Sequence, residues 1–216
     1  MVRIMKKSGN RLEGIGERID VRLTLLEEAL GMTPGDPEIY GNWIASKAPE
    51  PEGGEEEGGV IEGMDAVEDA TTCFPRTEDG VPFCWDYQIK GFFKDACSAL
   101  RRVPGTRSSK LTAFKKVIDG TVFVEQRRIP FQLPEGAECG RCERPLRASS
   151  ASGERVALAA SETVPAGTVL EFSFLVMNPK DAETVREGLD YGALRGLFQW
   201  RNSGKGRFEW EEVARD

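Results

Sequence analysis

The chain has 216 residues, of which 39% are hydrophobic and 30% are charged, and its formal net charge is −7. A chain of this length can bury a core without disulfide bonds, and no stretch approaches the roughly 18 uninterrupted apolar residues of a membrane span. Histidine is absent, which excludes Ser-His-Asp hydrolases, acid–base chemistry by histidine and histidine-ligated metals. Residues Met1 to Gly16 lack the apolar run of a secretory signal, and the five cysteines are an odd number. We therefore expect a cytoplasmic protein that contacts no membrane.

The charges are distributed unevenly along the chain. Residues 36–80 carry 13 acids and two bases, whereas residues 86–128 carry ten bases and four acids. The low-complexity stretch 49–59 lacks the apolar residues that would offset its ordering entropy. We expect a single domain over residues 1–216, with a flexible acidic insertion at about 48–60. The basic segment that follows permits a polyanion-binding surface on an acidic protein.

Hydrophobic periodicity in the first half of the chain predicts both strands and helices. A strand is expected over 19–26, because Val21, Leu23 and Leu25 alternate with polar residues. Helices are expected over 36–47 and 60–70. A hairpin over 76–87 and a helix over 88–102 follow.

The second half predicts more strands. Asp119-Gly120 between apolar pairs predicts a hairpin, and residues 127–133 extend the sheet. Strands are expected over 154–164 and 168–177, then a helix from Asn178 and a last strand over 208–213. Together these elements predict an α+β fold in which helices cover one face of an antiparallel sheet.

Two groups of cations are candidates for phosphate contacts. On the helix over 88–102, Lys90, Lys94 and Arg101 fall within about 40° of one another, which makes either a cationic ridge or a solvated face. The second group lies in a glycine loop, where three bases flank two glycines and Trp200 is placed to stack on a base. A plain connecting turn is the alternative, because the spacing is not that of a Walker loop. The loop reads Trp200-Arg201-Asn202-Ser203-Gly204-Lys205-Gly206-Arg207.

The order of these segments resembles a known family. An early apolar strand is followed by Ile89-Lys90-Gly91-Phe92-Phe93-Lys94 at a helix start and by Glu162-Thr163-Val164-Pro165-Ala166-Gly167-Thr168 before a strand. The glycine loop then precedes the last strand. This order is similar to that of the RAMP proteins, the repeat-associated RNA-binding superfamily of CRISPR effector complexes, over roughly residues 19–213. Two positions depart from the family pattern: Phe198 stands where glycine is usual, and Lys94 stands where arginine is common.

The resemblance implies a ferredoxin-like (RRM-type) sheet, binding of RNA or another single strand, and assembly with other subunits or with itself. It does not imply catalysis, because histidine is absent and the family's RNA-cleaving aspartate aligns with no position here. A phage or mobile-element relative could keep the fold and use it otherwise.

The cysteines and a run of arginines leave further alternatives open. Cys139-Gly140-Arg141-Cys142 has the spacing of half a zinc site, and the other two ligands would be Cys73 and Cys84. Free thiols or a reversible disulfide are the alternatives. Arg141, Arg144 and Arg147 recur every three residues. They either contact successive phosphates from an extended segment or lie exposed on a polar loop.

We therefore expect non-catalytic binding of single-stranded nucleic acid, RNA in preference to DNA, with zinc as the one possible cofactor. The expected contacts are Lys90, Lys94, Arg101 and the glycine loop. The alternative is a protein-interaction module or mobile-element inhibitor whose acidic insertion mimics nucleic acid.

Overall fold

The computed structural model describes residues 15–34, 71–150 and 153–214. The helices expected over 36–47 and 60–70, and the acidic insertion at about 48–60, lie outside these residues. Within them, no helix combines the length and the apolar character needed to cross a membrane.

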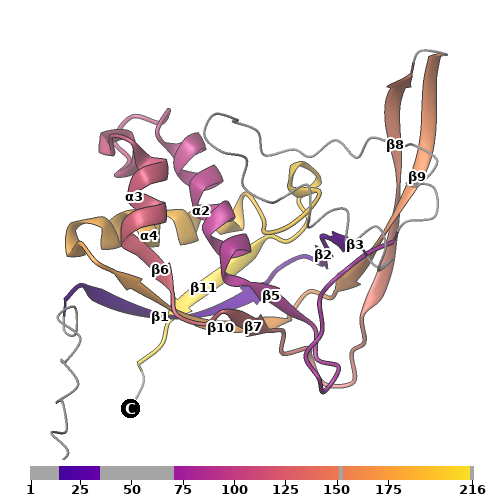
Figure 1. The fold of residues 1–216 in the computed structure, drawn as a ribbon, viewed down its shortest axis with the longest axis horizontal. Helices are drawn as coiled ribbons and strands as arrows, with labels where there is room; N and C mark the ends of the chain where they lie inside the picture. Colours follow the sequence, from indigo (N-terminus) through magenta and orange to yellow (C-terminus); the bar gives the residue numbers. More distant parts are fainter. Residues whose placement is uncertain (1–14, 35–70, 151–152, 215–216) are drawn as a thin grey trace, which may run out of the picture.

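The centre of the fold is a four-stranded antiparallel sheet with the order β11-β1-β10-β6. Its strands are β1 (Glu17–Leu25), β6 (Val122–Val124), β10 (Val169–Val176) and β11 (Phe208–Glu212). Two helices, α2 (Asp86–Leu100) and α3 (Phe114–Thr121), connect β1 to β6, and α4 (Ala182–Asp190) connects β10 to β11. The helices lie on one face of the sheet (Figure 1). This βαββαβ order is the ferredoxin-like arrangement that the sequence predicted.

Alternating apolar residues place the core between the sheet and the helices. On β1, Ile19, Val21, Leu23 and Leu25 are at most 1% exposed. On β10 the matching residues are Leu170, Phe172, Phe174 and Val176. Aromatic rings join the helices to the sheet edge to face. The ring centroids of Phe93 on α2 and Phe174 are 5.0 Å apart, and those of Phe92 and Phe208 are 5.2 Å apart.

A second sheet lies beside the first. It contains β2 (Ala29–Leu30), β3 (Thr33–Pro34), β4 (Thr71–Cys73), β8 (Gly140–Ser150) and β9 (Gly153–Val164). The β8–β9 hairpin projects away from the helices (Figure 1). A two-stranded sheet of β5 (Phe83–Trp85) and β7 (Arg128–Pro130) completes the strands. Short 3-10 turns are η2 (Ser108–Lys110), η3 (Pro179–Asp181), η4 (Tyr191–Ala193) and η5 (Arg201–Ser203).

The hairpin predicted at Asp119-Gly120 is wrong, because both residues lie inside α3. Phe114 and Ile118 are buried one helical turn apart, and Thr121 donates its hydroxyl to the carbonyl oxygen of Val117 at 2.7 Å. The helical spacing of the apolar residues thus prevails over a turn dipeptide. The hairpin expected over 76–87 is present in its first part, where Arg76 bridges Pro82 and the amide of Thr77 donates to the carbonyl oxygen of Val81 at 2.9 Å. Its second part differs, because β5 pairs with β7.

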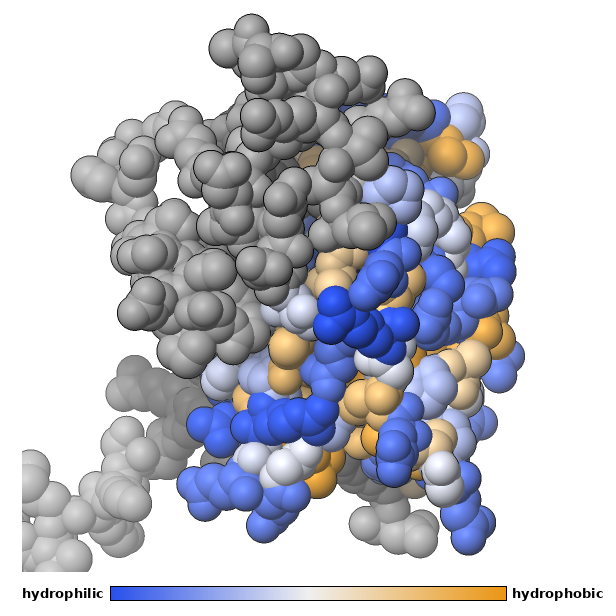
Figure 2. Space-filling view, turned by 90° about the vertical axis from the view of Figure 1, so that its right-hand side faces the viewer, coloured by the Kyte–Doolittle hydropathy of each residue, from blue (hydrophilic) through white to orange (hydrophobic). Residues whose placement is uncertain are grey.

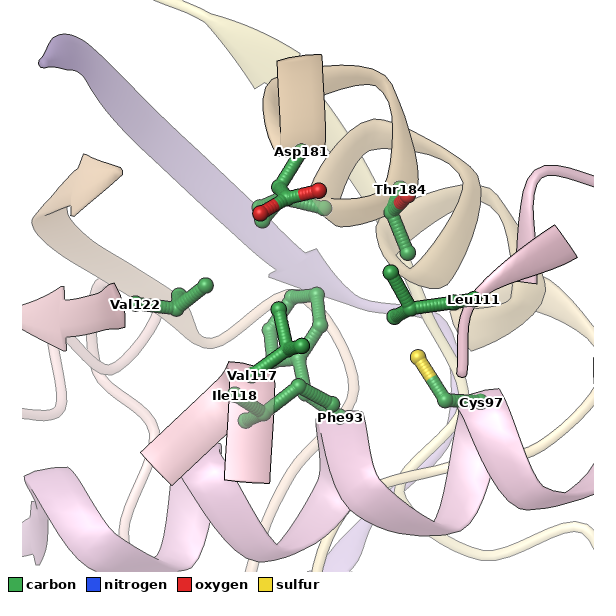
Figure 3. Close-up of a pocket in the computed structure, with 9 residues that line it drawn as sticks. Phe93, Cys97, Leu111, Val117, Ile118, Val122, Asp181 and Thr184 are labelled. Atoms are coloured by element: carbon green, nitrogen blue, oxygen red, sulfur yellow. The ribbon is translucent and has the colours of Figure 1, made fainter. Parts of the chain in front are cut away.

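The three helices meet at a small apolar cavity (Figure 3). Its volume is about 10 Å³, which is close to one water-sized sphere. Phe93 and Cys97 of α2, Ile118 of α3 and Val185 of α4 are among its lining residues. We regard it as a packing defect of the core rather than a ligand site.

Close packing of η4 against the last strand generates a stability prediction. A Cβ atom at Gly192 would overlap the ring of Phe208, which is fully buried. Gly192→Ala should therefore lower the free energy of unfolding by about 1–3 kcal/mol in a urea titration. Gly91→Ala is the matched control, because a Cβ there meets nothing within 4 Å. It should raise the free energy by about 0.5–1 kcal/mol as an ordinary helical alanine. Equal stability of the two variants would contradict the packing.

Candidate nucleic-acid interface

The glycine loop packs its backbone against the end of β1. The amide of Gly206 donates to the carbonyl oxygen of Glu28 at 2.8 Å, and the amide of Leu26 donates to that of Arg207 at 2.7 Å. A Cβ at Gly206 would overlap the carbonyl oxygen of Leu197, and its φ is +70°. The glycine therefore permits a close approach between two parts of the same loop.

Two non-glycine residues of this loop have left-handed backbone conformations. They are Phe198, with φ 65°, and Trp200, with φ 55°. Phe198 is the position at which the sequence departs from the RAMP pattern, and its backbone conformation is one that glycine adopts readily. Its side chain is 7% exposed and packs edge to face on Phe74 and Phe131. Burial of this ring offsets the strain and anchors the loop in the core.

Trp200 is the exposed aromatic of the loop, at 38% exposure. The guanidinium of Arg144, from β8, lies 5.5 Å from its ring centroid. Arg144 is 8% exposed and donates to Ser161 at 3.0 Å and to Gln199 at 2.5 Å. Burial lowers the pKa of Arg144 from its ordinary value. This network joins the glycine loop to the β8–β9 hairpin and presents an aromatic ring beside a cation.

The cations of the loop are paired with acids of the same chain. Arg201 lies 3.1 Å from a carboxylate oxygen of Asp95. Lys205 lies 2.5 Å from Glu28, and hydrogen bonding to Glu28 raises the pKa of the lysine. Arg207 lies 3.2 Å from Glu27. A phosphate at this loop would therefore have to compete with three carboxylates.

The remaining predicted residues of the loop have different surroundings. The side-chain oxygen of Asn202 accepts a hydrogen bond from Arg195 at 2.8 Å. Arg195 in turn pairs with Asp95, so Asn202 helps to hold the loop on α2. Ser203 is exposed, whereas Gly204 is partly buried and has φ +80°, and a Cβ there would lie 3.6 Å from Nε of Arg207. Ser203 is therefore the more accessible of the two positions.

The predicted ridge on α2 lies along the seam with α3. The ammonium group of Lys90 donates to the carbonyl oxygen of Asp119 at 3.1 Å and lies 5.1 Å from the ring of Phe123. Lys94 pairs with the carboxylate of Asp119 at 3.4 Å. Arg101 lies over the ring of Phe114 at 5.5 Å. All three cations of the ridge thus contact residues of α3, at its two ends.

The ridge and the glycine loop lie on different sides of α2. Asp95, which holds Arg195 and Arg201, is about 100–140° around the helix from the three ridge cations. The structure therefore does not gather the predicted contacts into one surface. On the face seen in Figure 2, coloured atoms are mainly hydrophilic with scattered apolar residues.

A group of aromatic and cationic residues was missed by the sequence analysis. Trp85 and Tyr87 stack with ring centroids 6.3 Å apart, and Arg127 lies over both rings at 5.3 and 5.8 Å. Arg128 lies over Trp85 at 5.5 Å. The signal in the sequence is the Arg127-Arg128 pair, but its placement depends on the pairing of β5 with β7, which brings Trp85 opposite Arg128.

The cysteines occupy separate environments. Cys84 is fully buried in β5, and burial raises the pKa of its thiol, which opposes the thiolate that zinc requires. Cys73 and Cys139 are partly buried, and Cys142 lies opposite Ser161 on the β8–β9 ladder. Over the described ranges, no three histidine, cysteine or acidic side chains are grouped as a metal site. Zinc at Cys139 and Cys142 stays a prediction.

Comparisons with known proteins support the fold. No protein-family model and no curated protein matches the sequence. Among solved structures, a chain of the type III-B Cmr-beta complex bound to cognate target RNA superposes with a TM-score of 0.57 and 10% identity, covering 94% of this chain. This chain spans 61% of that one. A chain of a type IV-B CRISPR complex gives a TM-score of 0.46 at 14% identity, covering 92% of this chain and 91% of that one. The first likeness shows that this chain shares its fold with that subunit.

The pairing of Asp95 generates a prediction about the loop. Its carboxylate holds both Arg195, at 2.5 Å, and Arg201, and its side chain is 24% exposed. Asp95→Asn should lower the free energy of unfolding by about 1–3 kcal/mol, because two partly buried guanidinium groups lose their counterion. Glu27→Gln is the control, since the pair it makes with Arg207 is more exposed and should be worth less than about 1 kcal/mol. Urea titrations compare the two, and a neutral Asp95→Asn would refute the role of this carboxylate.

Proposed function

We propose that the chain is a non-catalytic subunit of a CRISPR-type ribonucleoprotein that binds single-stranded nucleic acid, RNA in preference to DNA. The observation that carries the proposal is the exposed ring of Trp200, held in a left-handed conformation beside the guanidinium of Arg144. A connecting turn would normally have glycine or asparagine at such a position. A tryptophan there has a conformational cost without full burial, which favours a role in binding.

The surroundings of Trp200 suit an unpaired strand. An exposed aromatic ring beside cations is the arrangement on which single-stranded bases stack, with phosphates close to the positive charge. Ser203 is exposed at the tip of the loop and is accessible to a ligand. Arg201, Lys205 and Arg207 are the proposed phosphate contacts at this tip, in exchange for their present carboxylate partners. Lys90, Lys94 and Arg101 are proposed to extend the contact along α2.

The second aromatic group supports the same function. Trp85 and Tyr87 stack beneath Arg127 near the start of α2, and Tyr87 is 45% exposed. It offers another aromatic surface with cationic neighbours, away from the glycine loop. The fold adds a reason to prefer RNA, since the Cmr-beta complex with which it is shared is bound to target RNA. We propose that assembly with RNA and with other subunits takes place in the cytoplasm.

Trp200 provides the direct test of the proposal. Trp200→Gly should weaken binding of a fluorescein-labelled RNA oligonucleotide by about 5- to 100-fold, which corresponds to one lost stacking contact. The free energy of unfolding should change by less than about 1 kcal/mol, because glycine accepts the left-handed backbone. Fluorescence anisotropy measures the affinity, with a DNA of the same sequence as the comparison.

Trp210→Phe is the matched control. Trp210 is partly buried on β11, and its indole donates to Asp190 at 2.9 Å. Its substitution should leave RNA affinity unchanged. If Trp200→Gly binds RNA as the parent chain does, stacking at the glycine loop is wrong. If the parent binds neither RNA nor DNA at low salt, the proposed function is wrong.

The acidic insertion separates this function from a protein-interaction module. The segment 49–59 holds five glutamates, which should repel a nucleic acid or compete for the cations. Replacing residues 50–58 with a short Gly-Ser linker should therefore leave RNA affinity equal or higher. A variant that keeps its RNA affinity but loses a basic protein partner would instead favour the interaction module. Anisotropy and pull-down on the same preparation distinguish these results.

A further inference from the structure

We infer that the α2–α3 connection, defined here as residues 101–116 and including the first turn of α3, is a binding surface for the phosphate backbone of single-stranded nucleic acid. This inference rests on the proposed function and assigns to it a surface outside the glycine loop. The connection lies at the end of the two helices that points away from the central sheet (Figure 1). It contains six bases and no acid, and the bases are Arg101, Arg102, Arg107, Lys110, Lys115 and Lys116.

These six cations differ from those of the glycine loop in their ion pairing within the described residues. All six side chains belong to exposed residues. None of them makes an ion pair within the described part of the chain, whereas Arg201, Lys205 and Arg207 are each paired with a carboxylate. A cation that has no internal ion pair does not have to give up a carboxylate when it binds a phosphate. The free energy of counterion release therefore favours this connection over the glycine loop.

The connection is held in one conformation by a carboxylate from α4. Glu187 accepts hydrogen bonds from the amide of Arg107 at 2.6 Å, from the amide of Ser108 at 2.9 Å and from the hydroxyl of Ser108 at 2.6 Å. The amide of Ser109 donates to the hydroxyl of Thr106 at 3.0 Å. The cations thus project from an ordered backbone, so less entropy is lost when a ligand binds.

The start of α3 adds a strained residue at the same place. Ala113 has φ 52° and ψ 45°, a left-handed conformation that an alanine adopts at a cost. The ring of Phe114, directly after it, is buried and carries the guanidinium of Arg101 at 5.5 Å. This contact holds the end of α2 against the start of α3, so Arg101 lies next to the segment that carries Lys115 and Lys116.

A nucleic acid fits this surface better than an acidic protein does. Protein interfaces have apolar or aromatic anchors at their centre, and the exposed large hydrophobic residue of the connection is Val103, at 48%. Its exposed polar side chains are the cations and the hydroxyls of Ser109 and Thr112, and the small residues Pro104, Gly105 and Ala113 are exposed beside them. Cations and hydroxyl donors are the groups that contact phosphate oxygens without reading sequence.

The test removes four of the cations and measures the dependence of RNA affinity on salt. The variant carries Arg102→Gln, Arg107→Gln, Lys110→Gln and Lys115→Gln, and it leaves Arg101 on Phe114. The control removes the same charge elsewhere by Arg18→Gln, Arg22→Gln, Arg141→Gln and Lys180→Gln. Anisotropy with labelled poly(U) at several salt concentrations gives the slope of log affinity against log salt. Each lost phosphate contact should reduce this slope by about 0.7, so the variant should lose about 3 and the control much less.

The outcomes separate this surface from the proposed function. A reduced slope together with at least about tenfold weaker binding at low salt supports the inference. If the parent binds poly(U) and the four-glutamine variant keeps its affinity and slope, the surface is wrong and the proposed function stands. If the parent binds polyglutamate but no RNA, the connection is a protein-contact surface, and both the inference and the proposed function fail. Circular dichroism of each variant tests whether it is folded. The charge-conserving variant Arg102→Lys with Arg107→Lys should keep the parent's affinity and salt slope if charge alone is responsible.

Discussion

The ion pairs of Asp95 with Arg195 and Arg201 connect α2 with the glycine loop, the two parts of the structure on which the proposed binding depends. Asp95 lies on α2, and both arginines lie in the segment that leads into and forms the glycine loop. One side of α2 thus holds the glycine loop through Asp95. The other side of α2 faces α3 with the cations of the ridge. The same carboxylate that orders the loop also neutralises part of its charge. The positions of free positive charge therefore depend on which cations have internal partners, and only secondarily on how many cations each segment contains.

Local pattern was sufficient to predict much of the fold. The alternation of apolar residues identified β1 and β10, and the order of the motifs indicated the ferredoxin-like sheet before any pairing was known. The prediction was wrong at Asp119-Gly120, where a turn dipeptide lies inside a helix because Phe114 and Ile118 pack on the core. Packing against the core determines the secondary structure of such a segment, and rules that use only neighbouring residues do not include that packing.

The candidate site was predicted less completely, for a physical reason. The sequence identified the cations of the glycine loop, but their partners are distant: 106 positions separate Asp95 from Arg201, and 177 separate Glu28 from Lys205. Pairing over such separations is a property of the fold. The stacking of Arg127 on Trp85 likewise requires the register between β5 and β7. Phe198 was noted in the sequence only as a departure from the family pattern, and its left-handed backbone and its burial in the core depend on the folded structure.

The topology of the central sheet has a consequence for synthesis on the ribosome. Both neighbours of β1 are strands from the last quarter of the chain, β10 and β11, so β1 has no partner in this sheet until residue 169 and beyond have emerged. At the usual rates of translation this interval is on the order of 10 s. During it, the apolar face of β1 and its two unpaired edges are available to other chains. A nascent chain of this topology therefore depends on chaperones, or on early packing of α2 and α3 over β1, to reach the folded state without aggregating.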